Sequence, residues 1–300
     1  MEGFGSLPSD KHSILKGMAI PEVGGLLCTD EEQLNKQKGV LSHVVKQIAL
    51  NMLKGLPMSH MSLPIKIFEP RSSVQRICDL FSFAPKFLKE AGKTTDHLER
   101  LKLCIAFMVS SMYMCCDQNK PFNPILGETM QGKFLDGTII YCEHTSHHPP
   151  ITNFSIEDIE GNYTLSGYFE ICGKMGANNF VSGLRGPCFV DFKDGHHIRF
   201  GFPSYKLGGT VMGERTIETI GSCTFEDLSN NRKAVLLCST FKKTGWITSS
   251  STGSKDEING IIYDSHELSG SKDSLKKNYC KEIKFVEALN QLKDIREEIC

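Results

Sequence analysis

The second half of the chain is dominated by short segments rich in β-branched and aromatic residues. Turn signals separate these segments, among them Asp136-Gly137 and Asp194-Gly195, which are dipeptides that favour tight hairpins. No helical pattern alternates with the segments, so a parallel β-α-β sheet is not expected. We predict instead an antiparallel meander that closes into a barrel. Its strands are expected in TIIYCEH, PITNFSI, NYTLSGYFEIC, PCFVDF, HHIRFGF, ERTIETIGSCTFED, KAVLLCSTF and INGIIYD.

The first part of the chain has helical periodicity instead. Apolar residues recur at helical spacing over residues 31–54 and again over residues 73–91. A third helix is expected to begin at Asp96, because Asp96 and Glu99 resemble a capping box. This helix is apolar nearly all round and is therefore expected to be buried. Residues 63–72, LPIKIFEPRS, indicate an extended segment.

The two ends of the chain differ from both of these parts. The first thirty residues have a mixed composition and contain Gly24-Gly25, which suggests a mobile arm. The tail from Lys272 is charged, and its apolar residues fall on one helical face. We therefore expect a flexible arm in 1–30, a helical subdomain in 31–118, a β-barrel core in 119–265 and a helical tail in 266–300.

Composition narrows the possible functions. Lys and Arg total 34 and Asp and Glu total 35, which excludes a globally basic nucleic-acid-binding protein. No apolar run reaches the ~20 residues of a membrane-spanning helix, and the N-terminus lacks the pattern of a signal peptide. The 12 cysteines include no CxxC pair and lie mostly within apolar runs, as reduced thiols in a protein core do. A cytoplasmic protein is expected.

One unusual segment is KPFNPILGE, residues 120–128. Its prolines, Pro121 and Pro124, fix the backbone φ angle and hold Lys120 and Asn123 on a stiff loop. An ammonium group and a side-chain amide are donors that suit an anionic oxygen cluster such as a phosphate. The alternative is a rigid connector with a solvated lysine, and the segment alone favours that alternative.

A second unusual segment is EHTSHHPP, residues 143–150. Neighbouring side chains on a strand point to opposite faces, so His147 and His148 can serve one ligand only if the chain bends here. A metal site would combine His144, one of these two histidines and Glu143, but no HExxH motif accompanies them. No GxSxG motif supports a nucleophilic triad. Histidines that pack and cap at a barrel corner are the remaining alternative.

Together, the two segments resemble the oxysterol-binding-protein-related family, whose fingerprint is E-x-x-S-H-H-P-P. The stretches LPIKIFEPRS, FNPILGET and GERTIETIG are also similar to that family, and the resemblance covers about residues 60–263. The positions that match the fingerprint are Glu143, Ser146, His147, His148, Pro149 and Pro150.

The resemblance implies an α+β, mainly β fold. It consists of a large antiparallel, near-complete β-barrel around an apolar tunnel, with an N-terminal helical subdomain, a lid and a C-terminal helix. By position and composition, the lid is expected in Met18–Leu27. The tail KFVEALNQLKDIREEIC matches the family's C-terminal pattern only loosely, so no role is transferred to Lys284, Glu287 or Arg296.

The resemblance also implies a function. Family members extract a sterol or phosphatidylserine from one membrane, and many exchange it for phosphatidylinositol 4-phosphate. The residues expected to hold the phosphates are Lys120, Asn123, His147 and His148. No catalysis, cofactor or metal is implied. The expected protein is a monomeric lipid carrier that touches membranes transiently; the alternatives are a phosphoinositide sensor and, from another class, a histidine-metal hydrolase.

Overall fold

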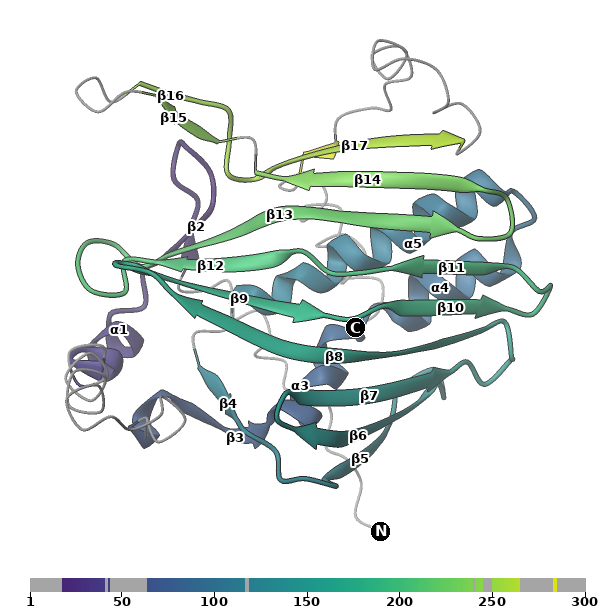
Figure 1. Cartoon of the computed structure of the whole chain (residues 1–300), viewed down its shortest axis with the longest axis horizontal. Helices are drawn as coiled ribbons and strands as arrows, with labels where there is room; N and C mark the ends of the chain where they lie inside the picture. Colours follow the sequence, from purple (N-terminus) through teal and green to yellow (C-terminus); the bar gives the residue numbers. More distant parts are fainter. Residues whose placement is uncertain are drawn as a thin grey trace.

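The computed structural model describes residues 18–40, 43, 64–116, 119–239, 241–244, 250–264 and 283–284. Most of the described strands belong to one curved, antiparallel sheet of 14 strands (Figure 1). Its main path runs in the order β18-β17-β14-β13-β11-β10-β8-β7-β6-β5. These strands are β5 (Thr129–Lys133), β6 (Ile139–His147), β7 (Pro150–Glu157), β8 (Tyr163–Met175), β10 (Cys188–Phe192), β11 (His197–Phe200), β13 (Thr216–Asp227), β14 (Arg232–Cys238), β17 (Glu257–Asp264) and β18 (Ile283–Lys284).

All eight predicted strand segments form strands. The pattern did not predict β9 (Asn179–Arg185) and β12 (Ser204–Gly208), which pair with each other and with β8 and β13. Their sequences, NFVSGLR and SYKLG, lack strict alternation and contain glycine. Strands of this kind depend on their neighbours in the ladder more than on their own propensity. A separate hairpin is formed by β15 (Lys242–Thr244) and β16 (Ser250–Thr252).

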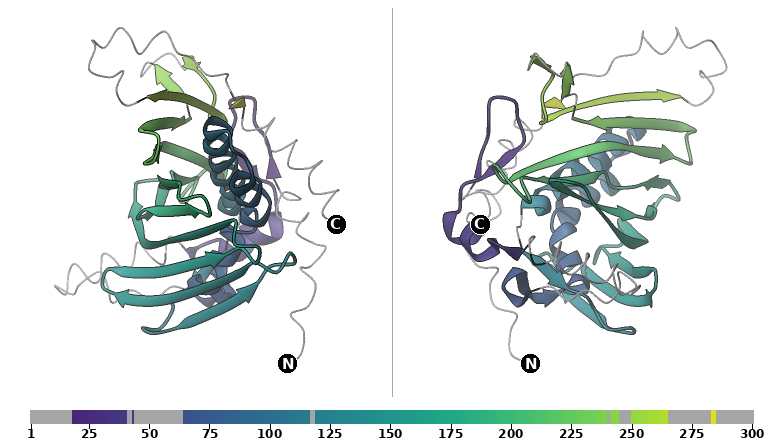
Figure 2. Two further views of the ribbon diagram at one scale, coloured as in Figure 1. Left: turned by 90° about the vertical axis from the view of Figure 1, so that its right-hand side faces the viewer. Right: turned by 60° about the vertical axis from the view of Figure 1, so that its left-hand side comes forward.

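Three helices lie against one face of the sheet (Figure 2). They are α3 (Ser73–Leu80), α4 (Ala84–Lys93) and α5 (His97–Ser111). Aromatic rings join the two layers, with 4.6 Å between the ring centroids of Phe81 and Phe154. Phe107 on α5 also contacts Phe200 on β11, edge to face, with 6.1 Å between the ring centroids. As predicted, α5 is largely buried, and the Asp96 side chain caps it. None of the described helices is both long enough and apolar enough to cross a membrane.

Two predicted helices are interrupted within their expected ranges. The helix predicted over 73–91 is two helices, because the chain turns at Phe81–Phe83 and Pro85 begins α4 instead of continuing α3. The helix predicted over 31–54 is interrupted after α1 (Glu31–Gln37), since Gly39 has a φ of 79°, in the left-handed region. Residues 44–63 lie outside the described part of the chain.

The extended segment predicted in 63–72 takes part in a two-stranded sheet that is separate from the large sheet. After a short 3-10 turn, η3 (Ile65–Ile67), strand β3 (Phe68–Ser72) runs parallel to β4 (Lys120–Phe122). Within the tail predicted to be helical, only β18 is described, and it pairs with β17 as a strand. The rest of the predicted C-terminal helix lies outside the described residues.

The N-terminal arm joins the sheet where it is described. Strands β1 (Met18–Ala19) and β2 (Leu26–Cys28) form a hairpin, which we call the β1–β2 hairpin. Strand β2 pairs with β13, opposite Thr216 and Ile217, and its Leu26 and Cys28 are buried. These residues are therefore an ordered strand pair, and their role as a lid stays a prediction.

Candidate functional site

Lys120 lies at the start of β4, and its partners among the described residues are neutral. Its Nζ donates to Asn123 Oδ1 at 2.7 Å and to the Pro121 carbonyl at 3.2 Å. The ammonium group also lies 5.0 Å from the centre of the Phe68 ring. No carboxylate pairs with Lys120 in the part of the chain that is described, and burial lowers the pKa of this lysine. The loop therefore holds a half-buried cation that has no counter-ion among the described residues.

The paired histidines lie at a hairpin turn. Strand β6 ends at His147 and β7 begins at Pro150, so His148 and Pro149 form the turn, joined by a cis peptide bond. Both histidines are exposed, and their ring centroids are 5.0 Å apart in an edge-to-face arrangement. The bend that a shared ligand requires is present.

His144 positions the first of these rings. Its side chain is fully buried; its Nδ1 lies 3.2 Å from Thr152 Oγ1, and its Nε2 lies 3.2 Å from His147 Nδ1. Burial lowers the pKa of His144, so this imidazole is neutral at pH 7. A neutral imidazole has one donor and one acceptor, and it can connect the threonine to His147. The Nε2 atom of His147 then remains for a ligand.

This role of His144 was not predicted, because the sequence suggested His144 as a metal ligand or as a packing residue at a barrel corner. The signal was the alternation of Ile140, Cys142 and His144 along β6, which turns all three inward. Glu143 lies on the opposite face and is exposed. Within the described residues, no three histidine, cysteine or carboxylate side chains are arranged to hold a metal ion. The metal-site alternative therefore has no support in this region.

Backbone hydrogen bonds join the lysine loop to the histidine strand. Gly127 N donates to the His144 carbonyl, and His144 N donates to the Glu128 carbonyl, both at 2.9 Å. The Glu128 carboxylate accepts from Ile125 N at 3.1 Å and from the Ser72 hydroxyl. The loop that carries Lys120 and Asn123 is thus fixed to β6 three residues before His147. Figure 1 shows β3 and β4 at the end of the sheet that carries the β6–β7 turn.

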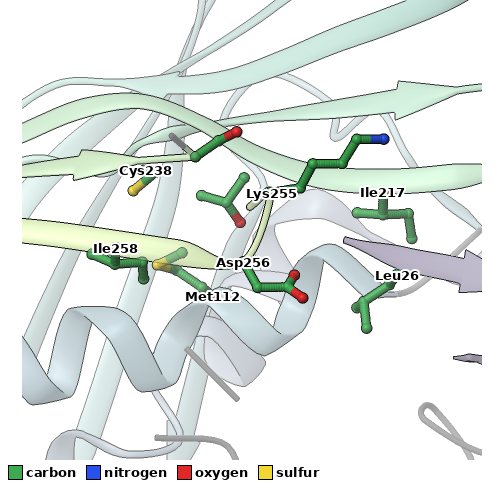
Figure 3. Close-up of a pocket in the computed structure, with 9 residues that line it drawn as sticks. Leu26, Met112, Ile217, Cys238, Lys255, Asp256 and Ile258 are labelled. Carbon is green, nitrogen blue, oxygen red and sulfur yellow. The ribbon is translucent and has the colours of Figure 1, made fainter. Parts of the chain in front are cut away.

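A small cavity lies beneath the β1–β2 hairpin (Figure 3). Its volume is about 20 Å³, enough for roughly one water molecule. Leu26 of the hairpin lies on its apolar side, and four polar residues also line it, including Thr219 and Ser239. The main lining residues are Leu26, Met112, Ile217, Ile258, Lys255 and Asp256.

Residues before β17 hold the β1–β2 hairpin over this cavity. Gly25 N donates to Asp256 Oδ1 at 2.6 Å, and Lys255 N donates to the Val23 carbonyl at 3.0 Å. Burial raises the pKa of the Asp256 carboxyl. Gly24 has a φ of 77°, and a Cβ there would lie 2.5 Å from Ser254 Oγ and 2.9 Å from Asp256 N. Only glycine fits this contact.

We expect Gly24→Ala to release the β1–β2 hairpin, because the new methyl group would press on backbone that cannot move aside. Hydrogen exchange of the amides in Leu26–Cys28 should accelerate about tenfold or more. Gly195→Ala is the matched control, since Gly195 has a φ of 84° and open space around it. Both variants carry the ~1–2 kcal/mol strain of a left-handed alanine. Equal exchange of β2 in the two variants would contradict the packing argument.

Comparisons with known proteins agree with this architecture. The family model described as oxysterol-binding protein matches residues 48–294. The chain is 36% identical over 215 residues to oxysterol-binding protein 9 of Dictyostelium discoideum, covering 71% of this chain and 50% of that protein. It is 28% identical over 211 residues to human oxysterol-binding protein-related protein 5, covering 67% of this chain and 24% of that protein. The chain therefore spans half or less of the length of these relatives.

Solved structures have the same fold. The Osh3 ORD of Saccharomyces cerevisiae in complex with PI(4)P aligns with a TM-score of 0.61 and 25% identity, covering 74% of this chain and 56% of that one. The Osh1 ORD domain in complex with ergosterol aligns with a TM-score of 0.58 and 23% identity, covering 70% of this chain and 48% of that one. These similarities confirm the predicted fold class, which is mainly β with a large antiparallel, barrel-like sheet.

Proposed function

Because this chain belongs to the oxysterol-binding protein family, we propose that it binds single lipid molecules and carries them between membranes. The observation that carries this proposal is the joining of two donor sets at one end of the sheet. Lys120 and Asn123 provide a cation and an amide, and His147 and His148 provide two imidazoles at the adjoining turn. Four donors of this kind suit a phosphate group on a lipid head.

We propose phosphatidylinositol 4-phosphate as one ligand and a sterol or phosphatidylserine as the other. The similar Osh3 domain was solved with PI(4)P, and the similar Osh1 domain with ergosterol. A phosphomonoester carries close to two negative charges, and each charge-assisted hydrogen bond contributes about 1.5–3 kcal/mol. A few such bonds distinguish a phosphoinositide from a sterol, which has a single hydroxyl group. Exchange then needs only the lipid gradient, with no catalysis, cofactor or metal.

The lipid tail requires a larger space than the structure offers under the β1–β2 hairpin. Each exposed CH₂ group costs ~0.8 kcal/mol in water, so a carrier must cover the tail during transit. The cavity of about 20 Å³ is far smaller than an acyl chain or a sterol. Opening of the β1–β2 hairpin would enlarge it, which supports Met18–Leu27 as the lid. The proposed carrier works as a cytosolic monomer that touches membranes only to load and unload.

Two measurements test this function. Native mass spectrometry of the protein purified from cytosol should show a bound lipid mass, whereas a bound zinc mass would support the hydrolase alternative. Extraction from a panel of vesicles, each with one labelled lipid, should then show uptake of phosphatidylinositol 4-phosphate and of one second lipid. Binding without extraction would instead identify a phosphoinositide sensor.

Lys120→Ala is expected to weaken phosphoinositide binding by about 2–3 kcal/mol, which is at least thirtyfold in affinity. The reason is that Lys120 is half-buried with neutral partners, so the phosphate would be its counter-ion. Titration calorimetry with a water-soluble, short-chain phosphatidylinositol 4-phosphate measures this loss. Lys66→Ala is the control, since Lys66 is an exposed lysine that donates to the Lys38 carbonyl. A loss below tenfold for Lys120→Ala would mean that this lysine is solvated and structural.

A further inference from the structure

Two large aliphatic side chains stand exposed on the loop that links the lysine to the histidine strand. Ile125 is 74% exposed and Leu126 is 66% exposed. Glu128 N donates to the Ile125 carbonyl at 3.0 Å and Gly127 has a φ of 80°, as in a tight turn of type II with Leu126 and Gly127 at its centre. We call these two side chains the Ile125–Leu126 tip.

The tip is fixed in its exposed position. The Glu128 carboxylate accepts from Ile125 N on one side of the turn and from the Ser72 hydroxyl of β3 on the other. Gly127 N is bound to the His144 carbonyl on β6. At the base of the loop, Phe122 stacks on Phe68 at 4.7 Å between ring centroids. The turn therefore cannot fold back to bury its aliphatic side chains without breaking these bonds.

From this geometry, we propose that the Ile125–Leu126 tip inserts into the surface of a lipid bilayer and turns the head-group site toward it. The inference rests on the proposed lipid-carrier function and adds the surface by which the protein docks. A carrier must bring its head-group donors to the level of the phosphates before it can extract a lipid. The tip lies on the same loop as Lys120 and is bonded to the strand of His147. Insertion of the tip would place Lys120 and His147 at the level of the lipid phosphates.

The charges around the tip fit an anionic membrane. Lys120 is on the tip's own loop, and Lys66 is exposed on η3, directly before the strand that pairs with β4. Ile65, beside Lys66, is also exposed, on the 3-10 turn that precedes β3. The Glu128 carboxylate keeps its negative charge, and its hydrogen bonds to Ile125 N and the Ser72 hydroxyl hold it against the loop and β3. Aliphatic side chains flanked by lysines are typical of membrane-surface contacts.

The chain contains a second exposed pair of the same composition, which serves as a comparison. Leu135 is 88% exposed in the β5–β6 turn, and Ile159 is 61% exposed in the β7–β8 turn. These turns lie at the opposite end of β6, whose nine residues span about 30 Å. Three carboxylates, namely Asp136, Asp158 and Glu160, share the single ammonium group of Lys89 at this end and leave an excess of negative charge. An anionic bilayer would repel that end of the sheet.

The experiment is flotation of the full chain with vesicles of phosphatidylcholine and phosphatidylglycerol that contain no phosphoinositide. The double variant Ile125→Ser/Leu126→Ser should lower the vesicle partition coefficient about tenfold. The matched double variant Ile159→Ser/Leu135→Ser removes the same two side-chain types at the other end and should change it less than about twofold. Because all four residues are exposed, both proteins should keep the native circular dichroism spectrum. An unchanged partition in the tip variant, or an equal loss in both variants, would overturn the proposal.

A binding measurement in solution distinguishes the role of the tip from the role of the head-group site. The tip variant should bind short-chain, water-soluble phosphatidylinositol 4-phosphate with native affinity, because no bilayer is involved. Loss of that binding would mean that Ile125 and Leu126 belong to the ligand pocket, which would overturn their role as a docking surface. If the unmodified protein does not bind the short-chain lipid, the proposed phosphoinositide function fails, while flotation still decides the role of the tip.

Discussion

Replacing both His147 and His148 with alanine is expected to abolish extraction of phosphatidylinositol 4-phosphate and to leave sterol extraction intact. The two rings lie at the β6–β7 turn, exposed and 5.0 Å apart, where both can donate to one phosphate. A sterol has no phosphate, so it loses nothing when these donors are removed. The measurement is extraction of each labelled lipid from vesicles by equal amounts of the two proteins.

The chain offers a matched control for this experiment. His196 and His197 are a second adjacent histidine pair and also lie at a hairpin turn, between β10 and β11. His196→Ala/His197→Ala should leave extraction of both lipids unchanged. Circular dichroism of each variant shows whether the fold is kept. Normal phosphoinositide extraction by a folded His147→Ala/His148→Ala variant would mean that the pair only packs and caps at the barrel corner.

The strands could be predicted from sequence wherever their own residues carry the signal. Segments such as TIIYCEH and KAVLLCSTF combine β-branched residues with turn residues at both ends, and both are strands. The β1–β2 hairpin was expected to be a mobile arm, because Gly24-Gly25 and a mixed composition indicate a loop. Its order comes from pairing with Thr216 and Ile217, about 190 residues further along the chain. Local pattern contains no information about such a distant partner.

The candidate site residues have a clearer signal in the sequence than the contacts that join them. The prolines of KPFNP indicate a stiff loop, and Lys120 and Asn123 do bond to each other on it. That the loop meets the histidine strand was implied only by the family resemblance. The joining hydrogen bonds are between backbone atoms of Gly127 and Glu128 and backbone atoms of His144. Every residue has these atoms, so the sequence does not indicate where such bonds form. The Ile125–Leu126 tip was missed for a related reason, since exposure of an aliphatic residue depends on the surrounding fold.

A buried arginine holds the helices against the end of the sheet that carries the β10–β11 turn. Arg100, near the start of α5, is 2% exposed, and its guanidinium lies 4.7 Å from the centre of the Phe192 ring. It donates to the carbonyls of Ala91 and Thr94 at 2.9 and 2.6 Å, which closes the end of α4. Its remaining donors bind both carboxylate oxygens of Asp194, at 2.6 and 3.1 Å. One side chain thus joins α4, α5 and the β10–β11 turn.

Asp194→Asn is therefore expected to cost about 3 kcal/mol of folding free energy at pH 7, because it leaves the charge of Arg100 buried without its partner. This is the lower end of the usual range, since the Asp194 side chain is 44% exposed. For a chain of 300 residues, the cost corresponds to a thermal midpoint lower by roughly 5 °C. Asp191→Asn in the same hairpin is the control; its partner His197 is exposed, and the midpoint should fall by less than about 1 °C.

The pH dependence of this loss identifies its electrostatic cause. Partial burial alone would raise the pKa of Asp194, but hydrogen bonds from Arg100 and His196 outweigh it and lower that pKa to about 2. The unfolded chain has the ordinary aspartate pKa of about 3.9, so the native state keeps the carboxylate ionised to lower pH. The stabilisation is complete above about pH 5 and is lost as the pH falls toward 2. The difference in thermal midpoint between the native protein and Asp194→Asn should stay constant from pH 7 to 5 and shrink steadily below that. A difference that is the same at pH 3 and pH 7 would mean that Asp194 acts through packing alone.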